Sequence, residues 1–130
     1  NKNLIDVIVS DHKPEDEESK RLTFSQAATG ASGIETFLSL ALEQFHNGSI
    51  KLEKIIELIT HNPAKILKID KGNLSVGVNA DFCIVDISKP WIVKKENLVS
   101  KSKNTSIEGR KLQGKVLSTF VKGNELYKLK

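Results

Sequence analysis

Hydrophobic residues form an almost unbroken run over residues 4–9, Leu-Ile-Asp-Val-Ile-Val. A short apolar run rich in β-branched residues is typical of a strand buried on both faces, as in a parallel sheet. The run ends at Ser10-Asp11-His12-Lys13-Pro14, and residues 13–21 are polar and densely charged. The pattern therefore predicts a buried strand that leads into a solvated loop.

Apolar positions then take up helical spacing. Ser32 and Glu35 match a capping box, which predicts a helix that ends at Asn47-Gly48. A second helix is expected over residues 51–60, and Asn62-Pro63 has the residue types favoured at the start of a third, short helix.

The spacing becomes extended after Lys71-Gly72. Strands are expected over residues 81–87 and 91–93, and a hairpin is expected around Gly123-Asn124. Residues 97–114 between them are polar, and so long a connection without structure indicates a functional or packing role. The order of elements is a strand, a loop, two to three helices and a small β module.

Composition narrows the class of protein. The chain is 38% hydrophobic and 28% charged, as expected for a soluble globular domain. Its net charge of +4 is spread along the chain, so we do not expect nucleic-acid binding. No run reaches the roughly 18 apolar residues of a membrane span, so a membrane partner is not expected. Cys83 lies in an apolar run, which predicts a buried thiol and a cytoplasmic, reducing location.

The chain contains no methionine, at position 1 or elsewhere, and residues 1–4 lack the apolar region of a signal peptide. The predicted first strand also needs partner strands, because a strand does not fold alone. We therefore expect upstream sequence to belong with this chain.

Asp11 and His12 stand where the predicted first strand ends. In α/β barrels catalytic groups cluster at such strand ends, and an aspartate there can ligate a metal and move a proton. A plain strand-ending turn accounts for the same residues. His46 and His61 have structural explanations near helix ends, and no two histidines have zinc-site spacing. Since zinc needs about four ligands, any others must lie outside this chain.

Gly30 and Gly33 precede the predicted capped helix. Glycines allow close backbone approach, and N–H groups at a helix start suit an anionic ligand. A flexible loop explains the same residues, and the spacing is not that of a P-loop.

Taken together, these segments resemble the C-terminal third of dihydroorotases in the amidohydrolase superfamily of metal-dependent (β/α)₈ barrels. The segments that carry the resemblance are Ser10 to Pro14, Gly30 to Thr36, Leu58 to Leu67, Gly72 to Phe82 and Ser100 to Thr105, followed by Gly109, Leu112 and Gly114.

The resemblance implies an α/β fold in two parts. Residues 1–70 would supply the last strand and helices of the barrel, and residues 71–130 the C-terminal part of a small β-sandwich. It also implies zinc-dependent reversible cyclisation of N-carbamoyl-L-aspartate to dihydroorotate in pyrimidine synthesis. One or two zinc ions would take most of their ligands from an N-terminal segment of the same protein.

Site residues follow from the same resemblance. Asp11 would ligate zinc and carry the proton to the leaving nitrogen, while Gly30 and Thr29 would hold the substrate through main-chain groups. Glu15 occupies the position where many relatives have a histidine that contacts the substrate carboxylate, and its charge has the wrong sign for that contact. Ser106-Ile107 also replaces the usual Pro-Phe.

Two other readings stay open. The chain could belong to a non-catalytic dihydroorotase-like subunit that scaffolds aspartate transcarbamoylase, or to another cyclic-amide hydrolase such as a hydantoinase or allantoinase. The resemblance also implies a homodimer.

Overall fold

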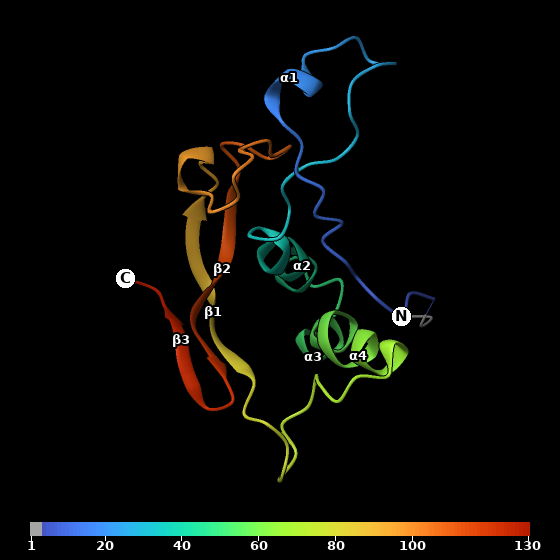
Figure 1. The fold of residues 1–130 in the computed structure, drawn as a ribbon. Coiled ribbons are helices and arrows are strands. Elements are labelled where there is room, and N and C mark those ends of the chain that lie inside the picture. The colour runs from blue at the N-terminus through green and yellow to red at the C-terminus, as the bar shows by residue number, and fades with distance from the viewer. Residues whose placement is uncertain (1–3) are drawn as a thin grey trace.

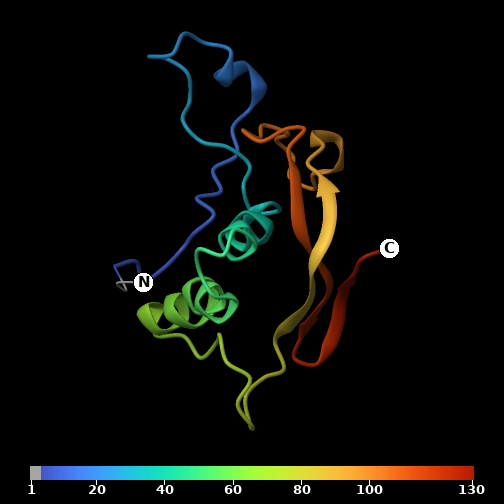
Figure 2. The same cartoon turned by 180° about the vertical axis from the view of Figure 1, so that it is seen from behind.

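The structure is a computed structural model that describes residues 4–130 (Figures 1 and 2). Residues 1–3, on which the expectation about a signal peptide largely rested, lie outside the described residues. The elements in chain order are α1 (Glu17–Lys20), α2 (Phe37–His46), α3 (Leu52–Ile56), the π-helical turn η1 (Glu57–His61), α4 (Asn62–Leu67), β1 (Phe82–Ile92), the 3₁₀ turn η2 (Lys95–Asn97), β2 (Lys111–Val121) and β3 (Asn124–Lys128).

The β module is a three-stranded antiparallel sheet in the order β1-β2-β3. The two strands expected over residues 81–93 form one long strand, β1, whose pairing with β2 is irregular between Asp86 and Pro90. The predicted hairpin is confirmed, but its turn is Lys122-Gly123 because Val121 pairs with Asn124. Both turn residues have positive φ, 52° and 80°, as the favoured two-residue turns require.

The predicted capping box is wrong, although the helix it announced is present as α2. Ser32 is buried and donates through its hydroxyl to the Ser102 carbonyl at 2.9 Å, instead of capping. The Glu35 carboxylate accepts from the Val99 and Ser100 N–H groups, and the helix begins at Phe37. Both side chains of the predicted capping box therefore bind residues 99–102 instead of the N–H groups at the start of the helix.

The predicted short helix at Asn62-Pro63 is present as α4, with Pro63 in its first turn, but the predicted cap at Asn62 is wrong. Asn62 has helical backbone angles, and α3, η1 and α4 follow one another without a break until Lys68, whose φ is 55°. The Asn62 side chain instead donates to the Asp6 carbonyl at 2.8 Å.

The strand expected over residues 4–9 does not form in the described part of the chain. The segment instead contacts the helices, where the Ile8 N–H donates to the Leu58 carbonyl at 3.0 Å. Leu4, Ile5 and Val9 are 81%, 64% and 71% exposed. A ladder needs an adjacent strand, and the described residues do not provide one.

The loop expected over residues 13–21 contains the short helix α1. Asp16 caps it by accepting from the Ser19 N–H at 2.8 Å. This hydrogen bond favours the carboxylate and lowers the pKa of Asp16.

The core lies where α2 packs on β2, and Figures 1 and 2 show the two elements side by side. Leu42 and Val93 are fully buried, and Leu42 fills the space where Gly114 has no side chain. A Cβ on Gly114 would lie 2.5 Å from Leu42 Cδ1, so glycine is what lets the helix approach. The Ser39 hydroxyl donates to the Gly114 carbonyl at 2.7 Å.

The Ser39 hydroxyl that binds Gly114 also contacts Trp91 of β1. Trp91 Nε1 donates to the Ser39 hydroxyl at 3.1 Å, and Lys115 Nζ lies 3.4 Å from the centre of the Trp91 ring. Partial burial lowers the pKa of Lys115, while the negative charge of Glu35 opposes that shift. A cation over an aromatic face is stabilised by the ring quadrupole.

Cys83 is exposed, so the expectation of a buried thiol is wrong. The apolar run that carries it begins β1, away from Gly114 where α2 packs, and residues 82–84 are all exposed. Among residues 4–130, none of the helices has the length and apolar character that a membrane span requires.

Candidate active site

One cleft brings together two of the predicted site residues, Asp11 and Gly30. It has a volume of about 540 Å³. Its walls come from the irregular segment 8–11, the loop 30–33, the start of α2 and residues 105–107. The structure therefore places the end of the N-terminal segment and the glycine loop at the same hollow.

Asp11 stands at the end of the N-terminal segment with an exposed side chain. Its φ is 44°, in the left-handed region that aspartate tolerates better than most residues. The chain turns sharply there, and Asp11 lines the cleft.

His12 holds the Asp11 turn against the glycine loop. Its Nδ1 accepts from the Gly33 N–H at 3.1 Å and from the Ile34 N–H at 3.3 Å. The main chain adds a parallel bridge between His12 and Ala31. An imidazole nitrogen that accepts hydrogen bonds carries no proton, so Nδ1 is the unprotonated ring nitrogen of His12 in this arrangement. Sequence reasoning had not given His12 this role.

Gly30 and Gly33 are required by close backbone approach. Gly30 has φ of 124°, and a Cβ there would lie 2.5 Å from the Lys13 carbonyl oxygen. A Cβ on Gly33 would lie 2.9 Å from the Ser10 carbonyl oxygen. The loop therefore presses directly on residues 10–13, and glycines are the residues that permit it.

Thr29 and Glu15 do not line the cleft that contains Asp11. Lys13 joins them to each other, because its Nζ lies 3.3 Å from both Thr29 Oγ1 and Glu15 Oε1. Glu15 lines a separate hollow with residues 100–103. Their roles in substrate binding remain predictions.

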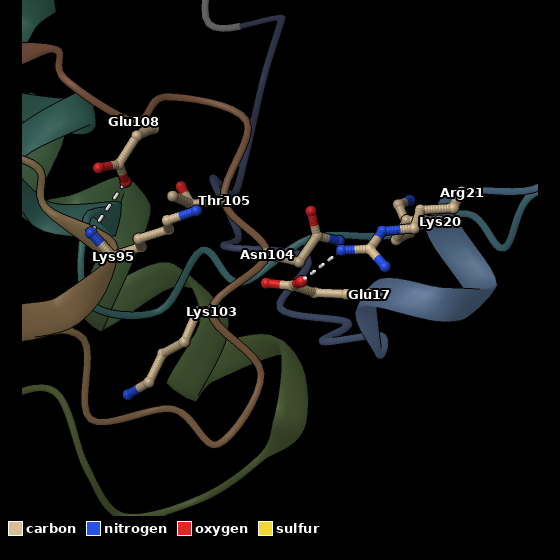
Figure 3. A pocket seen from close by; sticks show the side chains of 8 residues that line it. All are labelled: Glu17, Lys20, Arg21, Lys95, Lys103, Asn104, Thr105 and Glu108. Atoms are coloured by element: carbon tan, nitrogen blue, oxygen red, sulfur yellow. Dashed lines mark hydrogen bonds and ion pairs between the residues drawn. The ribbon is translucent and has the colours of Figure 1, made fainter.

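A third hollow, of about 300 Å³, lies between α1 and residues 103–105 (Figure 3). Within it Arg21 pairs with Glu17 at 3.3 Å, and the Lys95 N–H donates to Glu108 at 2.8 Å. Lys20 also lines it and donates to the Gly30 carbonyl at 2.9 Å. A basic side chain therefore secures the back of the glycine loop.

The residues described here do not by themselves fit a complete zinc site. Asp11 is the one carboxylate among the residues that line the cleft, and no histidine or cysteine lines it. No group of three His, Cys, Asp or Glu side chains within residues 4–130 is arranged to hold a metal. A catalytic zinc takes about three protein ligands, and among the described residues the cleft contains one side chain of a ligating type, Asp11.

Comparison with known proteins identifies the family. The model of the amidohydrolase family matches residues 1–126. The chain belongs to the amidohydrolase family. Among curated amidohydrolases it is 40% identical over 127 residues to the dihydroorotase of Wolbachia sp. subsp. Drosophila simulans, covering 98% of this chain and 29% of that protein. It is 41% identical over 123 residues to the dihydroorotase of Citrifermentans bemidjiense, covering 95% of this chain and 29% of that protein.

Solved amidohydrolase structures share the fold. The L-hydantoinase (dihydropyrimidinase) of Arthrobacter aurescens superposes with a TM-score of 0.87 at 32% identity, over 97% of this chain and 29% of that one. The dihydropyrimidinase of Brevibacillus agri superposes with a TM-score of 0.88 at 23% identity, over 95% of this chain and 28% of that one. The chain thus spans a little over a quarter of the length of the relatives it matches.

Proposed function

We propose that this chain forms the C-terminal part of a dihydroorotase, which cyclises N-carbamoyl-L-aspartate to dihydroorotate reversibly in pyrimidine synthesis. The main support is identity of 40% with curated dihydroorotases over nearly the whole chain. The meeting of Asp11 and Gly30 at one cleft supports the same reading. A cyclic amide with a carboxylate is the substrate class that this proposal assigns to the cleft.

Asp11 is the proposed catalytic residue. In the hydrolytic direction its carboxylate would take a proton from the attacking water and give it to the leaving ring nitrogen, and the cyclising direction reverses both transfers. The same carboxylate would be one of the ligands of zinc, which supplies Lewis-acid activation of water and of the amide when bound. Asp11 reaches outward from a sharp turn, which leaves its oxygens free for both tasks.

Gly30 is the proposed substrate-positioning group of the loop. Its carbonyl oxygen is already occupied by Lys20 and Asn104, at 2.9 and 3.3 Å. Its N–H makes no hydrogen bond within residues 4–130, so this donor is available to a substrate oxygen. A backbone N–H on a rigid loop suits a carboxylate or amide oxygen.

The remaining strands of the barrel and the other zinc ligands would come from an N-terminal segment of the same protein. The exposed apolar side chains of Leu4, Ile5 and Val9 support this part of the proposal, because they would be buried beside further strands. We call this chain, together with that segment and zinc, the assembled protein. It would work as a cytoplasmic homodimer.

The test is Asp11→Asn in the assembled protein, assayed for hydrolysis of dihydroorotate. We expect turnover to fall by about 10³-fold or more, because asparagine cannot transfer the proton. Asp70→Asn, at an exposed aspartate outside the cleft and the N-terminal segment, is the matched control and should retain turnover. Near-normal turnover in the Asp11 variant would rule out the proton-transfer role.

A hydantoinase is the second candidate, favoured by the 32% identity to the Arthrobacter aurescens L-hydantoinase. Rates for dihydroorotate and for hydantoins in the same preparation distinguish the two. A preference for hydantoins would replace the dihydroorotase proposal. The absence of either activity in zinc-loaded material would favour a non-catalytic scaffold, for which binding to aspartate transcarbamoylase is the direct assay.

A further inference from the structure

The long connection between β1 and β2 grips the glycine loop of the cleft. We call its residues 98–105 the brace. Its first residue, Leu98, is 6% exposed and anchors it in the core. The Ser32 N–H donates to the Asn104 carbonyl at 2.7 Å, and the Ser32 hydroxyl donates to the Ser102 carbonyl at 2.9 Å. Ser32 is 7% exposed, so these bonds are shielded from water.

The brace also reaches Gly30 itself. Asn104 Nδ2 donates to the Gly30 carbonyl at 3.3 Å, and Lys20 donates to the same carbonyl at 2.9 Å. Figure 3 shows Asn104 and Lys20 among the side chains around the hollow between α1 and residues 103–105. Two donors that line this hollow therefore hold the Gly30 carbonyl.

The brace also binds the residues on the C-terminal side of the loop. Glu35 accepts from the Val99 N–H at 2.9 Å and from the Ser100 N–H at 3.1 Å. A separate contact reaches the segment that follows Asp11, where the Ser102 hydroxyl donates to the Glu15 carbonyl. The brace thus contacts the loop at Gly30 and Ser32 and the chain just after it at Glu35.

The backbone at Gly30 needs the hydrogen bonds from the brace to hold one conformation. A glycine at φ of 124° has no side chain to restrict its backbone, and the direction of its N–H depends on neighbouring contacts. The Gly30 carbonyl belongs to the peptide unit after Gly30, and the donors from Lys20 and Asn104 fix that unit. Lys20 also donates to the Ala28 carbonyl, so the peptide units on both sides of the Thr29–Gly30 unit are held. This limits the rotation that would turn the Gly30 N–H, which the proposed function assigns to substrate.

We propose that Asn104 and Ser32 are positioning residues through which the β module sets the affinity of the cleft for substrate. The inference rests on the proposed function for the identity of the substrate and adds a role for residues that do not touch it. Such residues affect binding more than the proton transfer at Asp11. Removing them should therefore raise KM and leave kcat nearly unchanged.

The experiment compares Asn104→Asp and Ser32→Ala with Lys101→Ala in the assembled protein. Aspartate keeps the shape of asparagine but turns an oxygen toward the Gly30 carbonyl where a donor stood. Lys101 is an exposed brace residue whose side chain makes no hydrogen bond or ion pair among the residues described, so it is the matched control. Ser32→Ala provides an independent variant should Asn104→Asp prevent folding.

For each positioning variant we expect KM for dihydroorotate to rise about tenfold, with kcat within about twofold of the parent. Amide hydrogen exchange of residues 28–34 should accelerate by about the same factor, because the loop opens more often. The control should change neither quantity. A fall in kcat at constant KM, or unchanged KM in both variants, would overturn the proposal.

Hydrogen exchange separates this inference from the proposed function. If the parent protein does not turn over dihydroorotate, the proposed function fails, but hydrogen exchange still tests whether the brace restricts the loop. Faster amide exchange of residues 28–34 in the Asn104 and Ser32 variants would support that restriction. Unchanged exchange in both variants refutes it whatever the substrate.

Discussion

Single residues at the cleft are fixed by conformations that few side chains can adopt. Asp11 and Gly30 both have positive φ, and His12 binds two main-chain N–H groups of the facing loop. The sequence indicated a strand-end aspartate and a close-approach glycine, and both residues are found at the cleft. It could not indicate His12, because the spacing of residues does not reveal which groups a ring nitrogen will meet.

Gly30→Ala should destabilise the fold more than Gly48→Ala. Both positions have positive φ, which costs a side chain about 1–2 kcal/mol. At Gly30 the new Cβ would also lie 2.5 Å from the Lys13 carbonyl, adding about 1–3 kcal/mol, whereas no described atom lies within 4 Å at Gly48. Urea unfolding of the two variants measures the difference. Equal losses of unfolding free energy would contradict the close approach.

His12→Leu should destabilise the loop, and His12→Asn should largely restore it. Leucine leaves the Gly33 and Ile34 N–H groups without their acceptor, at a cost of about 1–3 kcal/mol. The asparagine side-chain oxygen can reach the place of Nδ1, so we expect it to retain most of that free energy. Thermal unfolding compares the two variants. A His12→Asn protein no more stable than His12→Leu would show that the ring acts through its size instead.

The spacing of hydrophobic residues predicted the secondary-structure elements better than the capping motifs did. The helix that ends at Asn47-Gly48 and the hairpin around Gly123-Asn124 were predicted because period and turn chemistry are local. The predicted caps at the helix starts were wrong, because Ser32, Glu35 and Asn62 direct their hydrogen bonds to distant main chain. The packing role expected for the long connection over residues 97–114 is found in the brace.

Asp81, just before β1, binds the hairpin turn between β2 and β3. Asp81→Asn should lower the unfolding free energy by weakening this contact. Its carboxylate pairs with Lys71 and accepts from the Lys122 N–H at 2.7 Å. The Lys71 hydrogen bond, followed by that of Lys122, lowers the pKa of Asp81. The stabilisation is therefore complete above the ordinary aspartate pKa of about 3.9 and is lost as pH falls through the lower folded pKa.

Urea unfolding over a pH series measures this effect. At neutral pH the parent should be more stable than Asp81→Asn, and the two should converge in strongly acidic solution. Asp70→Asn, at an exposed aspartate nearby, is the control and should track the parent at every pH. A stability difference that persists unchanged at acidic pH would show that the charge of Asp81 is not responsible.

From α2 onward the described chain follows the predicted order of helices and strands, but the strand expected over residues 4–9 does not form. A parallel strand takes its hydrogen bonds from adjacent strands, so the run at residues 4–9 carries the composition of a strand without forming one here. The β module needs no such help, because β1, β2 and β3 pair with one another in sequence order. Glu15 and Thr29 do not line the Asp11 cleft, and both contact Lys13 instead.

The grip of residues 98–105 on residues 30–35 has a consequence for protein engineering. A chimaera that exchanges the β module between two relatives replaces residues 98–105 but keeps the original residues 30–35. The glycine loop would then contact a brace from the other relative, even though the proposed substrate-binding groups are unchanged. A functional crossover should therefore transplant residues 28–36 together with the module, and insertions between β1 and β2 should be tolerated only outside residues 98–105.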